Sequence, residues 1–409
     1  MGELPMGGPF AVAEIGRRRL LAGGLAVVGA GTLAGCSPAD RAAEPGRGQA
    51  VQPARSEDQP GAGEPGRAVE SFHGEHQAGV ATTPQAHAAF LGLSLRRGTT
   101  RDHLRRLMRL LTDDAGRLTQ GRPALGDTEP GLAALPARLT VTFGFGPGFF
   151  QAAGLPGGPA PLPRFPVDRL RDRWSGGDLL VQLCCDDPVT LAHAVRMVRK
   201  DTRAFATVKW LQRGFRQATQ RPGHTHRNLM GQLDGTVNPR PGTPDFDRAV
   251  WIREGPLRGG TMLVLRRIEM LMDDWDAADT GAKEFAVGRR LDSGAPLTGT
   301  REHDPPDYAA VNGLGFPVIA QEAHIRRAHV ADPGLRMFRR PYSYEEADGE
   351  VGLLFAAYQA DVERQFVPVQ RRLAEADLLN QWTRPVGSAV FAIPPGCAEG
   401  GWIGETLLG

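Results

Sequence analysis

The sequence predicts an α+β fold. Strand-like and helix-like segments are mixed along the chain without a regular strand–helix–strand order. No glycine-rich phosphate loop follows a predicted strand, which counts against a doubly wound parallel sheet. A coarse two-fold organisation is also visible, because two successive stretches of the chain each carry strands and helices.

The first stretch contains two predicted helices and two predicted strands. Residues 101–111 and 188–200 carry apolar side chains at helical spacing and predict amphipathic helices. Residues 139–143 (LTVTF) alternate apolar and polar side chains and include β-branched residues, which is the pattern of a strand. Residues 178–183 (DLLVQL) predict the second strand.

The second stretch repeats this mixture. Short apolar runs predict strands at residues 261–265 (TMLVL), 351–358 (VGLLFAAY) and 388–393 (SAVFAI). Residues 367–379 predict a helix with Pro368 in its first turn, where the missing N–H of proline is tolerated.

Composition and charge narrow the class of protein. The 409 residues include 48 Lys and Arg against 46 Asp and Glu, so the net charge of +2 excludes an acidic tail protein and gives no reason to expect a nucleic-acid partner. The 53 glycines and 33 prolines exceed average usage, which indicates that part of the chain lies outside any core. Four cysteines are too few for a disulfide scaffold of this size.

The N-terminal segment has the pattern of an export signal. Arg17, Arg18 and Arg19 precede an apolar stretch at residues 20–33, which is shorter than the roughly 20 residues of a membrane span and is interrupted by glycines. Paired arginines followed by leucines before a weakly apolar region resemble a twin-arginine signal. The alternative is a basic amphipathic arm. We therefore expect export across the cytoplasmic membrane through the twin-arginine machinery.

The end of this segment, Leu33-Ala34-Gly35-Cys36, resembles a bacterial lipobox. Lipidation of Cys36 would anchor the protein at the membrane without spanning it, whereas an ordinary cleavage site would give a secreted protein. Residues 1–36 are thus predicted to be a signal peptide with a lipobox. Residues 37–71 are predicted to be a disordered linker, since they contain only two large apolar side chains, Val51 and Val69.

Two motifs carry candidate site residues. Asp234 lies in GQLDGTVNP at residues 231–239, where the alternative to a functional role is a plain turn. His324 lies in HIRRA, and its five-residue separation from His329 is a poor spacing for a two-histidine metal site. A single imidazole with an open site opposite commonly holds haem iron, while the alternative is a surface or core histidine.

A third motif contains adjacent arginines. Arg339 and Arg340 lie in FRRPYSY at residues 338–344. A guanidinium in this segment can stabilise a developing oxyanion, and the alternative is a solvated or salt-bridged surface.

Five segments in order resemble the dye-decolourising haem peroxidase family, in particular its exported, iron-transport-associated branch. They are residues 231–239 (GQLDGTVNP), 324–328 (HIRRA), 338–344 (FRRPYSY), 352–373 (GLLFAAYQADVERQFVPVQRRL) and 386–396 (VGSAVFAIPPG). The opening of the body at residues 72–80 (FHGEHQAGV) is also similar to the start of that branch.

The resemblance implies a dimeric α+β barrel arrangement of two ferredoxin-like halves with antiparallel sheets. The halves would comprise residues 72–222 and 223–409, with one haem b per chain in the second half. His324 matches the proximal iron ligand and Asp234 the distal acid. Arg339 matches the distal arginine, although Pro341 replaces the usual glycine and leaves Arg340 as the alternative. Gln232 and Leu233 also depart from the family pattern.

The activity implied by the resemblance is haem-dependent reduction of hydrogen peroxide, with dyes, phenolics or other one-electron donors as reducing substrates. Asp234 would transfer a proton between the two peroxide oxygens, and Arg339 would stabilise the charge on the departing one. The alternatives are a deferrochelatase that releases iron from haem, a peroxidase component acting with iron-uptake proteins, and a non-enzymatic haem carrier. A distal acid and arginine count against a simple carrier.

Several other residues are candidates for supporting roles. Three residues are candidates to orient His324, namely Asp361, Glu363 and Asn380. Five aromatic residues near the motifs are candidates for electron transfer, although core packing is expected for most of them: Trp251, Tyr342, Tyr344, Tyr358 and Trp382. Cys184 and Cys185 are neighbours at the end of a predicted strand, point to opposite faces and are expected to be core residues, as is Cys397.

Overall fold

Nine strands form a single sheet in the computed structural model, which describes residues 66–217 and 225–409. The strands are β1 (His87–Leu95), β2 (Thr140–Phe145), β3 (Leu179–Cys185), β4 (Ala206–Phe215), β5 (Thr261–Met270), β6 (Phe338–Arg339), β7 (Tyr342–Glu345), β8 (Val351–Gln359) and β9 (Thr383–Ile393). Their order is β5-β9-β2-β3-β1-β4-β7-β8-β6, and an additional β5–β8 pairing closes the sheet into a barrel. All these pairs are antiparallel.

The barrel consists of two halves with the same topology. The first half has the order β4-β1-β3-β2 and the second has β9-β5-β8-β7, so each places its first and third strands between its fourth and second. This is the ferredoxin-like arrangement that the resemblance implies, and the expected fold class is confirmed. The halves meet at two short seams, Phe145 opposite Ala392 and Phe215 opposite Ser343.

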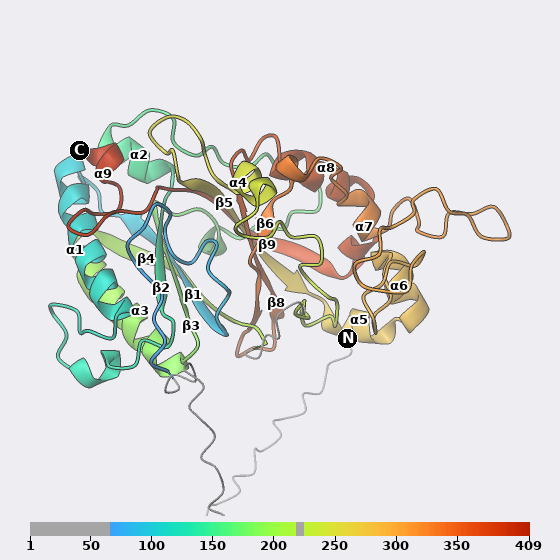
Figure 1. Cartoon of the computed structure of the whole chain (residues 1–409), viewed down its shortest axis with the longest axis horizontal. Coiled ribbons are helices and arrows are strands. Elements are labelled where there is room, and N and C mark those ends of the chain that lie inside the picture. The colour runs from blue at the N-terminus through green and yellow to red at the C-terminus, as the bar shows by residue number, and fades with distance from the viewer. Residues whose placement is uncertain (1–65, 218–224) are drawn as a thin grey trace, which may run out of the picture. The chain divides into compact units, whose positions relative to one another are not determined.

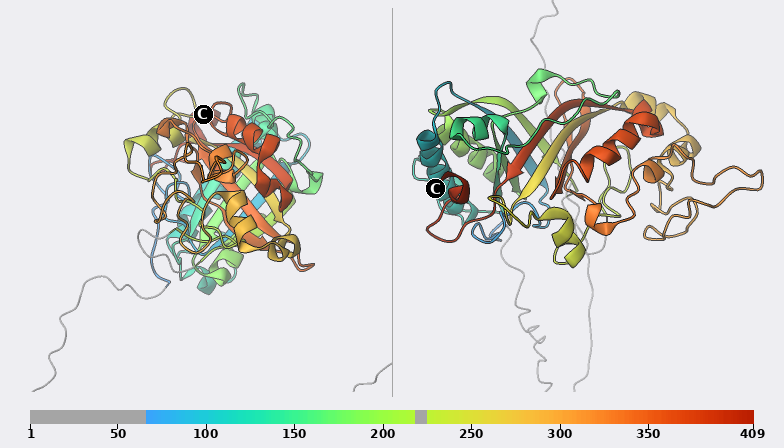
Figure 2. Two further views of the ribbon diagram at one scale, coloured as in Figure 1. Left: turned by 90° about the vertical axis from the view of Figure 1, so that its right-hand side faces the viewer. Right: turned by 90° about the horizontal axis from the view of Figure 1, so that it is seen from above.

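Helices cover the outside of the barrel (Figures 1 and 2). The three longest helices pack against the sheet: α1 (Arg101–Thr119) and α3 (Pro188–Thr202) cover the first half, and α8 (Phe366–Ala376) covers the second. The remaining helices in the described residues are shorter, namely α2 (Pro147–Ala153), α4 (Pro244–Val250), α5 (Met272–Ala277), α6 (Thr280–Val287), α7 (His324–Arg327) and α9 (Glu405–Leu408). Four 3-10 turns complete them: η1 (Pro130–Ala133), η2 (Asp172–Trp174), η3 (Pro333–Leu335) and η4 (Leu378–Gln381).

Side chains alternate between two cores. In β3, Val181 and Leu183 point toward α1 and α3, while Leu180 and Cys184 point into the barrel, where they pack with side chains of the second half. The barrel interior is therefore a filled core. Residues from the far end of the chain, Trp402 to Leu408, also enter the core under α1.

All eight predicted helices and strands are present, with ends that differ by a few residues. Four strands were not predicted: the long strands β1 and β4 and the short strands β6 and β7. β1 is buried on both faces and has no polar alternation, and its Gly92 lies where a Cβ atom would clash with the Trp210 indole of β4. β4 exposes the apolar side chains of Val208 and Phe215 and buries the polar side chain of Gln212, so its sequence does not show which face is buried.

The described cysteines are reduced and buried. Cys184 and Cys185 point to opposite faces of β3, as expected, and burial raises the pKa of the Cys185 thiol to about 12. Cys397 is buried as well. The predicted signal, Cys36 and most of the predicted linker lie outside the described residues. None of the helices in the described part of the chain combines the length and apolarity needed to cross a bilayer.

Candidate active site

His324 is the first residue of the short helix α7. Its Nδ1 lies 2.6 Å from Oδ2 of Asp377, whose side chain is almost fully buried. The carboxylate therefore accepts a hydrogen bond from Nδ1–H, which leaves Nε2 as the ring nitrogen that can bind a metal ion. The His324 side chain keeps 31% of its surface exposed, so a ligand can reach this ring.

The carboxylate also changes the basicity of the imidazole. Burial lowers the pKa of His324, but the charge of Asp377 and its hydrogen bond outweigh burial and raise the pKa above its ordinary value. A more basic imidazole is a stronger donor to a metal ion.

Asp377 replaces the three candidates that the sequence offered for this partner. The Asp361 carboxylate accepts a hydrogen bond from the backbone amide of Arg364, and the side-chain amide of Asn380 donates to the Leu373 carbonyl. The structure pairs His324 with none of them, Glu363 included. The apolar periodicity extended the helix to residue 379 and placed Asp377 in its interior. In the structure α8 ends at Ala376, and Asp377 leaves the helix to begin η4.

Asp234 and Arg339 form an ion pair across 105 positions of sequence. Nη1 of Arg339 lies 2.9 Å from Oδ1 of Asp234, and the aspartate side chain is buried. Asn238, from the same loop as Asp234, holds the partner strand: its Nδ2 donates to the Arg339 carbonyl at 2.6 Å, and the Arg339 amide donates to its Oδ1 at 3.1 Å. The loop is thus joined to β6 by both side chain and backbone.

Glycines permit the shape of this loop. Gly231 and Gly235 have φ values of 75° and 133°, which side-chain-bearing residues rarely adopt. The Asp234 amide donates to the His226 carbonyl at 2.9 Å, while its carboxylate is left for Arg339. Gln232, one of the departures from the family pattern, is buried, and its Nε2 has no hydrogen-bond partner among the described residues.

Arg339 ends β6, and Arg340 follows it outside the strand. Arg340 is fully buried and donates to the Thr82 carbonyl and to Oε1 of Gln85, so it belongs to the core between the halves. Pro341 has no N–H to donate and separates β6 from β7. Of the two arginines, Arg339 is the one that the structure brings to Asp234.

His324, Asp234 and Arg339 act on one another electrostatically. The positive charge of Arg339 lowers the pKa of His324 and the negative charge of Asp234 raises it, although both effects are smaller than that of Asp377. Because such effects decay with distance, the ion pair lies close enough to the imidazole to influence its charge, and the three residues are candidates for one site. The sequence placed these residues in three separate motifs, and the fold brings them together.

His226 and Arg216 were missed by the sequence analysis. Nη2 of Arg216 lies 2.7 Å from Nδ1 of His226, whose carbonyl receives the Asp234 amide. Burial and the charge of Arg216 lower the pKa of His226 to about 4, so the ring is neutral near pH 7. Neither residue belongs to a recognisable motif, and only their contacts identify them.

His226 is expected to make the fold less stable in acid. Its pKa is lower in the folded chain than in the unfolded one, so the unfolded state binds more protons between about pH 6.5 and 4, and stability falls as the pH decreases through this range. The full effect is on the order of 3 kcal/mol. Urea unfolding at pH 7 and pH 4.5 should show a smaller pH-dependent loss for His226→Gln than for the original chain, and equal losses would contradict this role.

Most of the aromatic candidates are core residues. Tyr342, Tyr344 and Tyr358 are fully buried in the barrel interior, as expected. Trp382 is different: it is half-buried, follows η4 and meets Trp275 edge to face at 5.2 Å.

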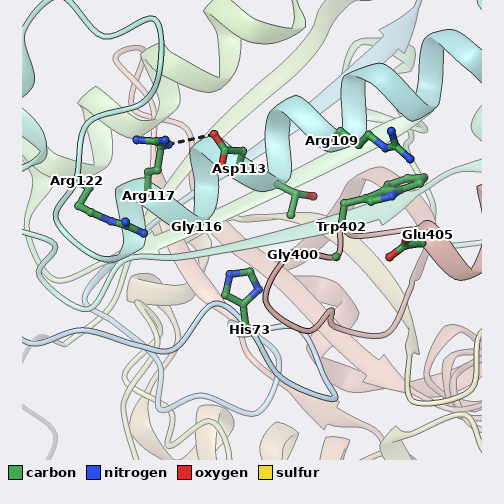
Figure 3. A pocket seen from close by; sticks show the side chains of 11 residues that line it. His73, Arg109, Asp113, Gly116, Arg117, Arg122, Gly400, Trp402 and Glu405 are labelled. Atoms are coloured by element: carbon green, nitrogen blue, oxygen red, sulfur yellow. Dashed lines mark hydrogen bonds and ion pairs between the residues drawn. The ribbon is translucent and has the colours of Figure 1, made fainter.

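A cavity of about 520 Å³ lies elsewhere, between α1 and the C-terminal segment. Its wall includes the Arg117–Asp113 ion pair, at 3.0 Å, and Arg109 over the Trp402 ring (Figure 3). It shares no residue with the His324 site. Acidic and basic side chains alternate around it, and we assign it no role in the chemistry.

Two family models match the chain. The model described as Dyp-type peroxidase, N-terminal, matches residues 77–216, and the model described as Dyp-type peroxidase, C-terminal, matches residues 225–398. The chain belongs to the Dyp-type peroxidase family. The second match spans the three candidate site residues: Asp234, His324 and Arg339.

Individual relatives agree with this assignment. A dye-decolorizing peroxidase of Thermobifida fusca is 41% identical over 333 residues, covering 76% of this chain and 77% of the relative. A deferrochelatase of Escherichia coli K12 is 33% identical over 432 aligned positions, covering 97% and 98%. A DyP-type peroxidase from Cellulomonas bogoriensis superposes with a TM-score of 0.81 at 49% identity, covering 84% of this chain and 99% of that one. Ferric DtpA from Streptomyces lividans gives 0.79 at 41% identity, covering 84% and 98%.

This Dyp-type peroxidase is an oxidoreductase with haem as its cofactor, as expected from the resemblance. The donor set fits that group: an imidazole whose Nδ1 donates to a carboxylate can offer Nε2 to iron, and a second carboxylate paired with a guanidinium lies near it.

The Asp377 contact carries a testable consequence. Asp377→Asn keeps the side-chain size but removes the negative charge behind His324, so we expect haem affinity to fall by about 10–100-fold with the fold intact. Haem titration followed by absorbance measures this, and circular dichroism checks the fold. Asp361→Asn serves as the control. Unchanged affinity in Asp377→Asn would show that the contact does not support the ligand.

Proposed function

We propose that His324, Asp234 and Arg339 form the peroxide-reducing site of this chain. The observation that carries the proposal is the buried Asp234–Arg339 ion pair, which shares its site with a histidine whose Nε2 is left available by Asp377. His324 would hold the iron of one haem b through Nε2. The bound haem supplies the redox-active iron at which peroxide is reduced.

The protein residues then have separate tasks. The Asp234 carboxylate would accept a proton from hydrogen peroxide and return it to the oxygen that departs as water, with the haem as the source of the two electrons. The Arg339 guanidinium stabilises negative charge on the departing oxygen. Asn238 holds the Arg339 backbone, and the His226 carbonyl holds the Asp234 amide, so both groups are oriented before peroxide arrives.

The reducing substrates that we propose are dyes, phenolics or other one-electron donors. Trp382 is the aromatic residue best placed to pass electrons from a donor at the surface, because it is partly exposed, packs on Trp275 and lies five residues beyond Asp377. The three buried tyrosines have no exposed surface and cannot meet a donor directly.

Release of iron from haem is a second candidate function. It is favoured by the deferrochelatase match, which covers 97% of this chain, whereas the Thermobifida peroxidase match covers 76%. One experiment separates the two. Haem-loaded protein is mixed with hydrogen peroxide and a dye, and both dye bleaching and iron-free porphyrin are followed. Bleaching without porphyrin release supports the peroxidase proposal, and porphyrin release without bleaching contradicts it.

We also propose that the protein is exported, is lipidated at Cys36 and acts together with iron-uptake proteins. This proposal is supported by the twin-arginine-like residues and by the lipobox-like residues that follow them.

We expect folded protein to stay inside the cell when Arg17, Arg18 and Arg19 are changed to lysine, because the twin-arginine machinery recognises the arginine pair. The Cys36→Ala variant should still be exported but should lose its lipid attachment. Cell fractionation and mass spectrometry of the mature N-terminus measure both. An unmodified N-terminus downstream of Cys36 in the original protein would contradict the anchor.

A further inference from the structure

A loop before His324 projects from the body beside α6 and α7 (Figure 1). It turns back on itself at residues 311–317, where Val311 and Pro317 form an isolated antiparallel bridge. Three large apolar side chains at its tip point into solvent: Val311, Leu314 and Phe316 are 60%, 82% and 64% exposed. No charged residue occurs between Asp307 and Glu322. The apolar tip, defined as residues 311–316, is thus an exposed patch on a projecting element.

Four hydrogen bonds within the apolar tip involve Asn312. Oδ1 of Asn312 accepts from the amides of Leu314 and Phe316, each at 3.0 Å. The Gly315 amide donates to the Asn312 carbonyl at 2.9 Å, and the Asn312 amide donates to the Phe316 carbonyl at 2.8 Å. The amides of Asn312, Leu314, Gly315 and Phe316 are thus already paired within the tip, which lowers the cost of moving this irregular backbone toward the apolar part of a bilayer.

The base of the loop is held to the body. The Tyr308 hydroxyl donates to the Ile325 carbonyl at 3.1 Å, and the Arg326 guanidinium donates to the Tyr308 carbonyl. Ile319 and Ala320 are buried against Ile325. The tip is thus presented by a fixed stem rather than covered by the protein's own core.

We propose that the apolar tip inserts into the interfacial region of a phospholipid bilayer. A second copy of this chain is a poorer occupant, because a stable dimer buries about 800 Å² on each partner, far more than three side chains on a narrow tip supply. The interfacial region of a bilayer needs only a few apolar side chains, and the four paired amides of the tip lower the cost of placing it there. The inference goes beyond the proposed peroxidase function and does not depend on it.

Vesicle flotation tests the proposal with residues 37–409, which omit the apolar N-terminal stretch. The described residues, 66–217 and 225–409, and their hydrophobic cores lie within this range. The vesicles contain phosphatidylcholine with a minority of phosphatidylglycerol. Leu314→Ser combined with Phe316→Ser removes the tip side chains. Leu125→Ser combined with Val189→Ser removes two exposed apolar side chains from the first half as the matched control.

We expect the original protein and the control to float with the vesicles. The partition coefficient of the tip variant should be at least about ten-fold lower. Equal flotation of tip variant and control, or no flotation of the original protein, overturns the proposal. Light scattering without lipid adds a further outcome: a dimer that becomes a monomer only in the tip variant also overturns it, by assigning the tip to a protein contact. Haem loading and peroxide reaction of the tip variant report on the proposed function separately.

Discussion

Replacing His324 with alanine is expected to abolish stable haem binding. The imidazole is the group that offers an available nitrogen at the site, and its Nδ1 is already committed to Asp377. Loss of the ligand itself should cost more than the about 10–100-fold that loss of a supporting partner costs. Absorbance spectra after haem titration measure the occupancy and the Soret band.

His329→Ala is the matched control. His329 is five residues further on, contacts the Tyr308 ring edge to face and has no part in the site. It should bind haem with an unchanged spectrum. Normal occupancy and a normal Soret band in His324→Ala would show that another group holds the iron.

Asp234→Asn and Arg339→Leu are expected to keep haem and lose the reaction with peroxide. Asparagine cannot accept and return a proton, so the peroxide-dependent absorbance change should slow by about 10²–10⁴-fold. Leucine at position 339 removes the charge near the departing oxygen and should slow it by about 10²–10³-fold. Stopped-flow mixing of haem-loaded variants with hydrogen peroxide measures both.

The neighbouring arginine provides the contrast. Arg340 is buried between the halves and donates to Thr82 and Gln85, so Arg340→Leu should lower the unfolding temperature while the folded fraction reacts with peroxide at the original rate. A slow Arg340→Leu and a normal Arg339→Leu would reverse the assignment of the two arginines.

The parts of the fold that sequence could predict were those with a one-sided pattern. Helical spacing identified α1 and α3, which bury one face. Alternation of apolar side chains with threonine identified β2, although the structure buries both of its faces. β1 has no polar alternation, and β4 exposes Val208 while it buries Gln212, so neither carries the pattern of a half-buried strand. The two are nevertheless neighbours in the sheet.

The site shows the same division. Asp234, His324 and Arg339 lie in motifs that a resemblance can identify, although their proximity comes only from the fold. Asp377 was hidden because the helix pattern continued past the point where the chain leaves the helix. His226 acts through its carbonyl and through a contact with Arg216, and backbone contacts of this kind leave no trace in residue type.

The segment from Trp402 to Leu408 has a consequence for folding order. Its side chains complete the core under α1, and Arg101 and Arg105 in that helix donate to the Leu408 carbonyl, a pairing across 307 positions for Arg101. The first half therefore cannot finish its core until residues beyond the entire second half have arrived, and the entropy of closing so long a loop delays this step. We expect the two halves to unfold in one cooperative transition, so that damage to either one lowers the survival of both.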